Sequence, residues 1–265
     1  MQSDQSNDGE AVGEVRSAVA EFEGVLQRAR AEKYPAEVLE MLSRSAPATW
    51  RLEELLDSYL RAGDRYPSDR LKGVMDRAMD LKLQLFFIME VDLGLYNWAY
   101  QDLINANPSL ADSALLKLRR MSFDQSLIGK SRILWERLMS LVYYMETGRD
   151  IPKTGKGSVK SSFFSWIRTT PRWRYLEPYE QFLESFDASY RTPEYHKRSI
   201  LRAELLGRRT HDPNALLEPV NRAINHIWEA ILAVLSGQAP RVFSDLHRPA
   251  GDEHGIDSRY LEQQT

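Results

Sequence analysis

Residues 191–196, Arg-Thr-Pro-Glu-Tyr-His, combine side chains that can cleave a phosphodiester. Histidine exchanges a proton near neutral pH, and the planar fork of donors on arginine binds a phosphate. Thr192 is a typical N-cap, Pro193 suits the first helical position, and Glu194 complements the positive end of a helix. The run therefore predicts a helix N-terminus where Arg191, His196 and free backbone amides surround a site for an anion.

Two other stretches of the chain have a similar spacing, Arg241 to His247 and Arg248 to His254. The residues after these arginines are valine and proline, which are not polar, and both stretches lie in a tail rich in proline and glycine. The spacing alone is therefore not distinctive. What distinguishes residues 191–196 is their position at a predicted helix start between two core helices.

An arginine, a polar residue, about three free positions and a histidine resemble the signature of the HEPN superfamily of helical ribonucleases. Arg191, Thr192 and His196 match these positions, although asparagine is commoner than threonine after the arginine. The helix at 131–139 and the run at 190–201 are also similar, so the resemblance covers roughly residues 110–236. It implies metal-independent cleavage of RNA by attack of the 2′-hydroxyl, at a site assembled across a homodimer. It also implies a bacterial toxin–antitoxin or phage-defence role, with an antitoxin or defence-system protein as partner.

Charged residues near the predicted site have two interpretations. Glu136 lies on a strongly patterned helix and could orient His196 or tune its pKa. The alternative is an exposed face of ion pairs, which contributes little energy. Lys197, Arg198 and Arg202 would extend an electropositive surface for RNA along the helix that follows Arg191.

The segment from Arg149 to Tyr175 mixes bases with aromatic rings. Up to Arg174 it contains seven basic residues and one acid, Asp150. Bases neutralise phosphates and rings stack on nucleobases, so the segment suits single-stranded RNA, and the candidate phosphate-binding residues are Lys153, Lys156 and Lys160. A solvated basic loop followed by core aromatics has the same composition, and that is the interpretation we favour for Phe163, Phe164 and Trp166.

No cofactor or metal site is expected. Residues 155–158, Gly-Lys-Gly-Ser, lack the upstream glycine spacing and the preceding strand of a phosphate loop. The histidines do not show the four-residue pairing of a helical zinc site. His226 could be a second polar group in the site, but a histidine at the edge of the core is the commoner case.

The fold class that must position these residues is all-α, a bundle of about eight to ten helices. Apolar residues recur at three- and four-residue steps through most of the chain, and no alternating strand pattern occurs. We expect a disordered N-terminus at 1–9, an N-terminal helical region at 10–108, a HEPN-like helical bundle at 109–236 and a flexible tail at 237–265. Predicted helix ends include Gly63, Gly148 and Gly237, with starts at Ser68, Pro178 and Asn214.

Composition excludes some classes of protein. The 265 residues contain no cysteine, which removes disulfides and cysteine nucleophiles and fits a cytoplasmic location. The start is polar and acidic, unlike a secretory signal, and Glu90 and Asp92 interrupt the longest apolar stretch, so no membrane span is expected. Acids outnumber bases up to Leu60 although the net charge is only −3, and this charge asymmetry favours an anion-binding region on an acidic body.

Three functions are compatible with these patterns. The first is an endoribonuclease of HEPN type. The second is a non-catalytic helical interaction module, or an inactive HEPN relative, that binds a protein or RNA partner. The third is a small-molecule enzyme with a pocket lined by Trp135, Tyr143 and Trp166, for which the sequence indicates no substrate.

Overall fold

The computed structural model describes residues 4–33, 50–88, 105–108, 114–152, 158–192, 194, 200–206 and 213–238, and this part of the chain contains helices and no strand. The α-helices are α1 (Asp4–Lys33), α4 (Leu52–Arg61), α5 (Leu71–Phe86), α7 (Ala114–Thr147), α8 (Val159–Thr169), α9 (Pro178–Phe186), α11 (Ile200–Leu205) and α12 (Pro213–Leu235). Short 3-10 turns are η1 (Gly63–Arg65), η2 (Ser68–Arg70) and η5 (Pro171–Leu176), and η6 (Asp187–Arg191) is a π turn. The predicted all-α bundle is confirmed.

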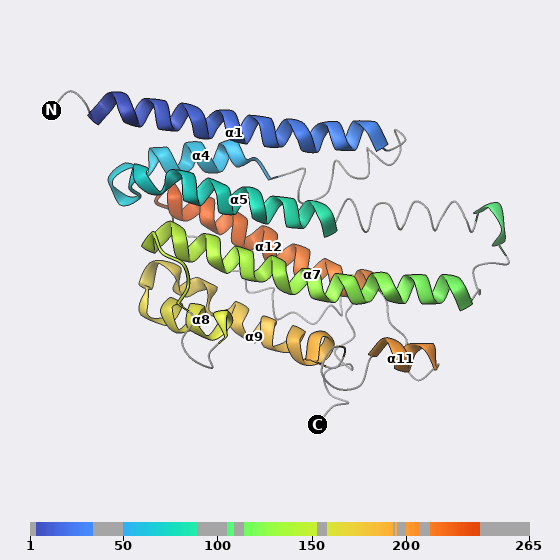
Figure 1. Cartoon of the computed structure of the whole chain (residues 1–265). Helices are drawn as coiled ribbons and strands as arrows, with labels where there is room; N and C mark the ends of the chain where they lie inside the picture. Colours follow the sequence, from blue (N-terminus) through green and yellow to red (C-terminus); the bar gives the residue numbers. More distant parts are fainter. Residues whose placement is uncertain are drawn as a thin grey trace.

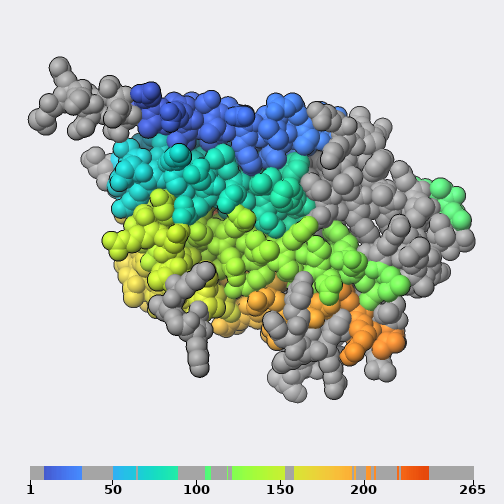
Figure 2. Space-filling view, viewed as in Figure 1, coloured from blue at the N-terminus to red at the C-terminus, as the bar shows by residue number. Residues whose placement is uncertain are grey.

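The long helices lie side by side in layers (Figure 1). α1 covers α4 and α5, α5 packs along α7, and α12 contacts both α4 and α7. α8 and α11 pack on α7 on the side away from α5. Figure 2 shows the same order of layers on the surface, from α1 in blue through α5 in teal and α7 in green to α11 in orange. None of the helices in the described ranges has the length and apolar character needed to cross a membrane.

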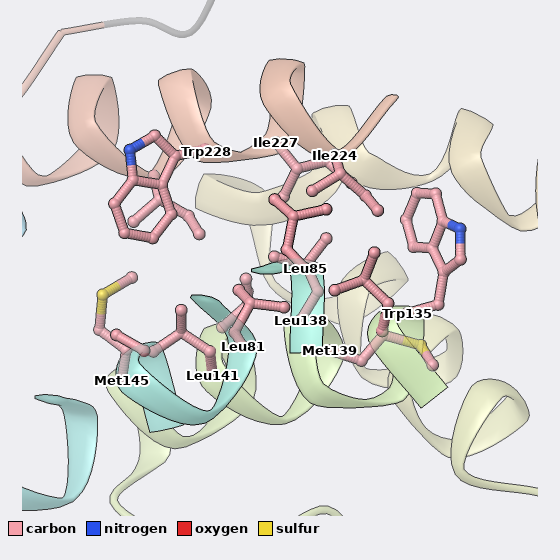
Figure 3. Close-up of a cluster of buried hydrophobic side chains, with 14 of the residues drawn as sticks. Leu81, Leu85, Trp135, Leu138, Met139, Leu141, Met145, Ile224, Ile227 and Trp228 are labelled. Carbon is pink, nitrogen blue, oxygen red and sulfur yellow. The ribbon is translucent and has the colours of Figure 1, made fainter. Parts of the chain in front are cut away.

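One hydrophobic core joins the two predicted helical regions. Leu81 and Leu85 of α5 meet Leu138 of α7 and Ile224 and Ile227 of α12, all almost fully buried (Figure 3). The same cluster continues through α4, α8 and α9. The predicted boundary between residues 108 and 109 therefore does not separate two cores among the described residues. Periodicity defines the apolar face of each helix but does not indicate which helix covers it.

Local sequence signals explain where several helices begin and end. Leu52, Leu55, Leu56 and Tyr59 are all buried on one face of α4, at the spacing that predicts an amphipathic helix. The chain then turns at Gly63 with a φ of 55°, and Gly148, at 68°, follows the end of α7. Both are left-handed conformations that favour glycine, so these two predicted helix ends are confirmed.

Two predicted helix boundaries are wrong. α1 begins at Asp4, so residues 4–9 form the first turns of a helix instead of the disordered segment expected at 1–9. Ser68 starts a 3-10 turn and does not cap α5, whose N-cap position is Arg70. Most of the tail expected at 237–265 lies outside the described residues, which end at Gln238.

A close contact fixes the spacing of α5 and α7. A Cβ atom placed on Gly73 would lie 2.6 Å from two ring carbons of Tyr144, so only the absence of a side chain allows this ring to pack there. The guanidinium of Arg77 covers the same ring, 3.7 Å from its centroid. Gly73 and Arg77 of α5 thus hold Tyr144 of α7 from two sides.

Candidate functional site

Arg191 lies within a helical stretch and not before the start of a helix. α9 continues into the π turn η6, and Thr192 has helical φ and ψ angles of −65° and −46°. The backbone N–H of Thr192 donates to the carbonyl oxygen of Asp187, so it is not a free amide. The predicted N-cap at Thr192 is therefore wrong. The apolar side chains of α9 keep the chain helical past Phe186, and the ring of Tyr190 packs 5.6 Å from that of Phe186.

Several predicted site residues lie outside the described residues. They are His196, Lys197 and Arg198, together with Lys153 and Lys156 of the loop before α8. The structure consequently does not test whether His196 approaches Arg191. Glu194 is described, and its carboxylate accepts hydrogen bonds from the Gln125 side chain at 3.0 Å and from the backbone N–H of Leu201 at 3.4 Å. It joins α7 to α11, where Arg202 is exposed.

A single carboxylate, Asp187, lies beside three cations from three elements. Arg132 Nε of α7 is 3.5 Å from Asp187 Oδ1, and Arg191 Nη1 of η6 is 4.0 Å from the same oxygen. Lys160 Nζ of α8 is 3.6 Å from Asp187 Oδ2. We call Arg132, Lys160, Arg191 and Asp187 the Asp187 cluster. It brings together two residues that the sequence analysis selected separately, Lys160 and Arg191.

Arg132 is the most buried member of the Asp187 cluster. Its side chain is 8% exposed, against 17% for Lys160 and 39% for Arg191. Its Nε and Nη1 atoms, and Asp187 Oδ1, are buried and form no hydrogen bond within the described part of the chain. Burying a guanidinium with unused donors is costly, so the charges of its neighbours must hold it there.

Glu136 extends the Asp187 cluster by one residue. Its Oε1 atom lies 3.4 Å from Arg132 Nη2, one helical turn away on α7, and its side chain is 44% exposed. The contact joins a half-exposed carboxylate to a buried guanidinium, so it is only partly the exposed ion pair of the alternative interpretation. His196 lies outside the described residues, so a role of Glu136 in orienting it stays a prediction.

The sequence analysis did not select Arg132 or Asp187 as site residues, although both carry a signal. Arg132 is four residues after Ile128 and three before Trp135, and both of these are buried, so the helical period places Arg132 on the core face of α7. Asp187 precedes Arg191 by four residues, the spacing of an ion pair along a helix. Such a cluster can be identified in a sequence by a charged residue on the core face of one helix and an ion-pair spacing of charges in another.

The aromatic part of the basic segment lies in the core. Phe163, Phe164 and Trp173 are at most 3% exposed, and Trp166 packs against Tyr143 with ring centroids 4.9 Å apart. The favoured interpretation as core residues is confirmed for Phe163 and Phe164, whereas Trp166 is partly buried against the core. The two buried phenylalanine rings are not available to stack on RNA bases.

The bases of η5 and α8 are engaged in ion pairs. Arg168 pairs with Glu180, and Arg174 lies 3.7 Å from Glu177. Arg172 Nη1 lies 3.1 Å from Glu146 Oε1. The hydrogen bond to Tyr66, together with the negative charge of Glu146, raises the pKa of the Arg172 guanidinium. Acids from outside this segment therefore offset the positive charge of Arg168, Arg172 and Arg174.

Glu146 is the centre of a polar network at the end of α7. Its Oε2 atom accepts hydrogen bonds from Tyr66 Oη at 3.1 Å and from Trp173 Nε1 at 3.0 Å, and its backbone carbonyl accepts one from Arg70 at 2.9 Å. Burial, followed by the negative charge of Glu146, raises the pKa of Tyr66 to about 12. This network fastens η5 and the turn before α5 to α7, which is a structural role.

Within the described part of the chain, the cavity beside Trp135 is too small for a small molecule. The cavity lined by Trp135, Phe164 and Tyr179 has a volume of only about 10 Å³, and Trp135 is 1% exposed. An open groove of about 330 Å³ lies between α5 and α7, but its walls are charged residues such as Arg137 and Asp80, which pair at 2.6 Å. In the ranges described, no three histidine, aspartate or glutamate side chains gather as metal ligands.

Residues 155–157 lie outside the described residues, and the described element before them is the helix α7. Comparison with protein-family models, with curated proteins and with solved structures found no match to this chain. The Asp187 cluster is therefore the candidate site that the geometry itself provides.

Proposed function

We propose that this chain is a metal-independent endoribonuclease of HEPN type, and that the Asp187 cluster holds the phosphate of its RNA substrate. One observation carries the proposal: Lys160 and Arg132, from two other helices, lie with Arg191 around a single oxyanion, the carboxylate of Asp187. Cations from separate elements that converge on one anion form the kind of site that a phosphodiester requires.

The proposed reaction uses Arg191 and His196. The 2′-hydroxyl oxygen attacks the phosphorus while the bond to the 5′-oxygen breaks, which leaves a 2′,3′-cyclic phosphate and a free 5′-hydroxyl. His196 takes the proton of the 2′-hydroxyl or donates one to the leaving oxygen, and Arg191 neutralises the charge that develops on the phosphate. A second histidine from a partner copy would supply the complementary proton transfer, which is why we propose a homodimer.

A second candidate is a non-catalytic HEPN relative that binds RNA or a protein partner. The observation that favours it is the placement of Arg191, which already faces Asp187 and is followed by a Thr192 whose N–H is used within the helix. The Thr192 N–H is therefore not free to bind an anion. The two candidates differ in one measurable property, cleavage of RNA.

The test compares RNA cleavage by the native protein, Arg191→Ala and His196→Ala. Because the two residues act as a unit, we expect either substitution to reduce the rate by at least about a hundredfold. His254→Ala is the matched control, since His254 also follows an arginine at a similar spacing. Equal cleavage by the native protein and His196→Ala contradicts the ribonuclease proposal, and RNA binding without cleavage by any of them supports the non-catalytic candidate.

We further propose that the protein is cytoplasmic and belongs to a toxin–antitoxin or phage-defence system, in which RNA cleavage inside the cell arrests growth. Expression of the native protein should then arrest growth, and His196→Ala should not. Light scattering on the purified full chain measures whether it forms the proposed homodimer, and a purely monomeric protein with full activity contradicts the shared site.

A further inference from the structure

The ion pairs of the Asp187 cluster are too long to be good hydrogen bonds. Arg132, Lys160 and Arg191 approach the carboxylate at 3.5 Å, 3.6 Å and 4.0 Å. Charge-assisted hydrogen bonds between nitrogen and oxygen are usually about 2.7–2.9 Å long. The carboxylate thus balances the charge of the cations without satisfying their donors, which agrees with the absence of hydrogen bonds at Arg132 Nε, Arg132 Nη1 and Asp187 Oδ1 within the described residues.

The exposure of the side chains gives the cluster an outer and an inner layer. Arg191 and Lys160 reach solvent, whereas Arg132 lies beneath them and is more than nine-tenths buried. An anion arriving from solvent meets Arg191 and Lys160 first. Glu184, whose side chain is 62% exposed and whose Oε1 atom lies 3.9 Å from Lys160 Nζ, adds a second negative charge beside this approach.

We infer that Asp187 is an internal counter-anion that occupies a phosphate site formed by Arg132, Lys160 and Arg191, and that a phosphodiester of single-stranded nucleic acid displaces it. This inference rests on the proposed function and names how the same site is regulated. When no substrate is present, the carboxylate of Asp187 balances the positive charge of the buried Arg132 guanidinium. The same carboxylate competes with the phosphate of the substrate for this position. Its position in a π turn fits such a role, since π turns within helices occur frequently at functional sites.

The opposite role for Asp187 is to orient Arg191 toward the substrate, and the two roles predict opposite signs. A competing carboxylate weakens binding, so removing its charge should strengthen binding. An orienting carboxylate supports binding, so removing its charge should weaken it. The sign of the change in affinity on Asp187→Asn therefore decides between them.

The experiment measures binding of a short single-stranded oligodeoxynucleotide to the full chain by fluorescence anisotropy. This strand has no 2′-hydroxyl, so it cannot be cut by the proposed reaction, and its affinity is independent of cleavage. We expect Asp187→Asn and Glu184→Gln to tighten binding by roughly threefold to tenfold, because each removes a negative charge beside the phosphate. Lys160→Ala should weaken binding and lower the slope of log affinity against log salt by about one.

Glu177→Gln is the matched control, because it removes the same charge from a carboxylate outside the cluster, next to Arg174. Affinity that rises equally in Glu177→Gln shows a general charge effect and contradicts the inference. Unchanged or weaker binding by Asp187→Asn contradicts it as well. If circular dichroism shows that Asp187→Asn does not fold, Glu184→Gln and Lys160→Ala decide in its place. Glu184 and Lys160 are not part of the hydrophobic core, so we expect both variants to fold.

Inorganic phosphate as a competitor distinguishes the two sources of the anion. Displacement of the strand only by a large excess of phosphate supports nucleic acid as the occupant, and displacement by stoichiometric phosphate contradicts it. Failure of the inference is separable from failure of the ribonuclease proposal. A protein that binds the strand with the expected order of affinities but cuts no RNA loses the catalytic proposal and keeps the site.

Discussion

Trp50 and Trp228 stack face to face, with ring centroids 4.5 Å apart and an angle of 5° between the ring planes. Trp50 Nε1 also donates to Asn225 Oδ1 at 2.7 Å, and the backbone carbonyl of Trp50 accepts from the buried Lys82 at 2.6 Å. Lys82 forms an ion pair with Glu23 of α1. Residue 50 therefore connects α1, α5 and α12 at one point.

The ion pair between Lys82 and Glu23 predicts that removing one charge destabilises the protein more than removing both. Glu23→Gln removes the charge of the carboxylate that pairs with the ammonium of Lys82, which is only 3% exposed, and should lower the free energy of unfolding by about 2–4 kcal/mol. The double variant Glu23→Leu with Lys82→Met removes both charges and should be more stable than Glu23→Gln. Urea denaturation measures both, with Glu21→Gln, at an exposed position on α1, as control. Equal stability of Glu23→Gln and this control would show that the pair contributes nothing.

The contact between Gly73 and Tyr144 predicts opposite effects for the same substitution at two helical glycines. Gly73→Ala forces a methyl group against the Tyr144 ring and should destabilise the protein by about 1–3 kcal/mol. Gly13→Ala, on α1, meets no atom within 4 Å and should stabilise the helix by about 0.5–1 kcal/mol. Thermal melts of the two variants should move in opposite directions from the native protein.

The raised pKa of Tyr66 predicts a loss of stability at alkaline pH. The unfolded chain releases the phenol proton near a pKa of 10, and the folded chain holds it until about 12. The folded state therefore binds more protons between these values, and stability falls as pH rises through this window, by an amount on the order of 2 kcal/mol for this group. Burial raises the pKa of Tyr59 to about 12 as well, so its contribution has the same sign.

Tyr66→Phe tests this contribution. The variant should be less stable than the native protein at neutral pH, because it lacks the hydrogen bonds with Glu146 and Arg172. Between pH 10 and pH 12 its stability should fall less steeply than that of the native protein. Denaturant unfolding at a series of pH values measures the slope, and identical slopes would assign the alkaline loss to other groups.

The buried ion pair of the Asp187 cluster predicts energetic coupling between Arg132 and Asp187. A double-mutant cycle with Arg132→Met and Asp187→Asn should give a coupling energy of about 1–3 kcal/mol. The same cycle on Arg174 and Glu177, whose side chains are 69% and 41% exposed, should give less than about 0.5 kcal/mol. Similar values for the two pairs would mean that burial does not strengthen the interaction in the cluster.

Much of the fold could be predicted because its signals are local. The apolar face of α4, the end of α7 at Gly148 and the start of α9 at Pro178 all follow from periodicity or backbone preference over a few residues. The assignment of Phe163 and Phe164 to the core follows from the same kind of signal, since aromatic side chains bury large apolar areas.

The candidate site was harder to predict because it depends on contacts between distant segments. Thr192 has every local property of an N-cap, yet the packing of α9 keeps it helical, because a cap contributes only about 1 kcal/mol. The convergence of Lys160 on Asp187 requires α8 and α9 to fold back on each other, which no spacing in the sequence indicates. The position of His196 relative to Arg191 stays a prediction.

The stack of Trp50 on Trp228 joins two residues that are synthesised at very different times. During synthesis the ring of Trp50 leaves the ribosome long before α12 exists, so for most of translation it has no partner on that side. The apolar faces of α4, α5 and α7 share this condition, because α12 is the last of the described helices to cover them. The nascent chain then exposes a hydrophobic surface until α12 emerges, and a chaperone can bind that surface during this interval.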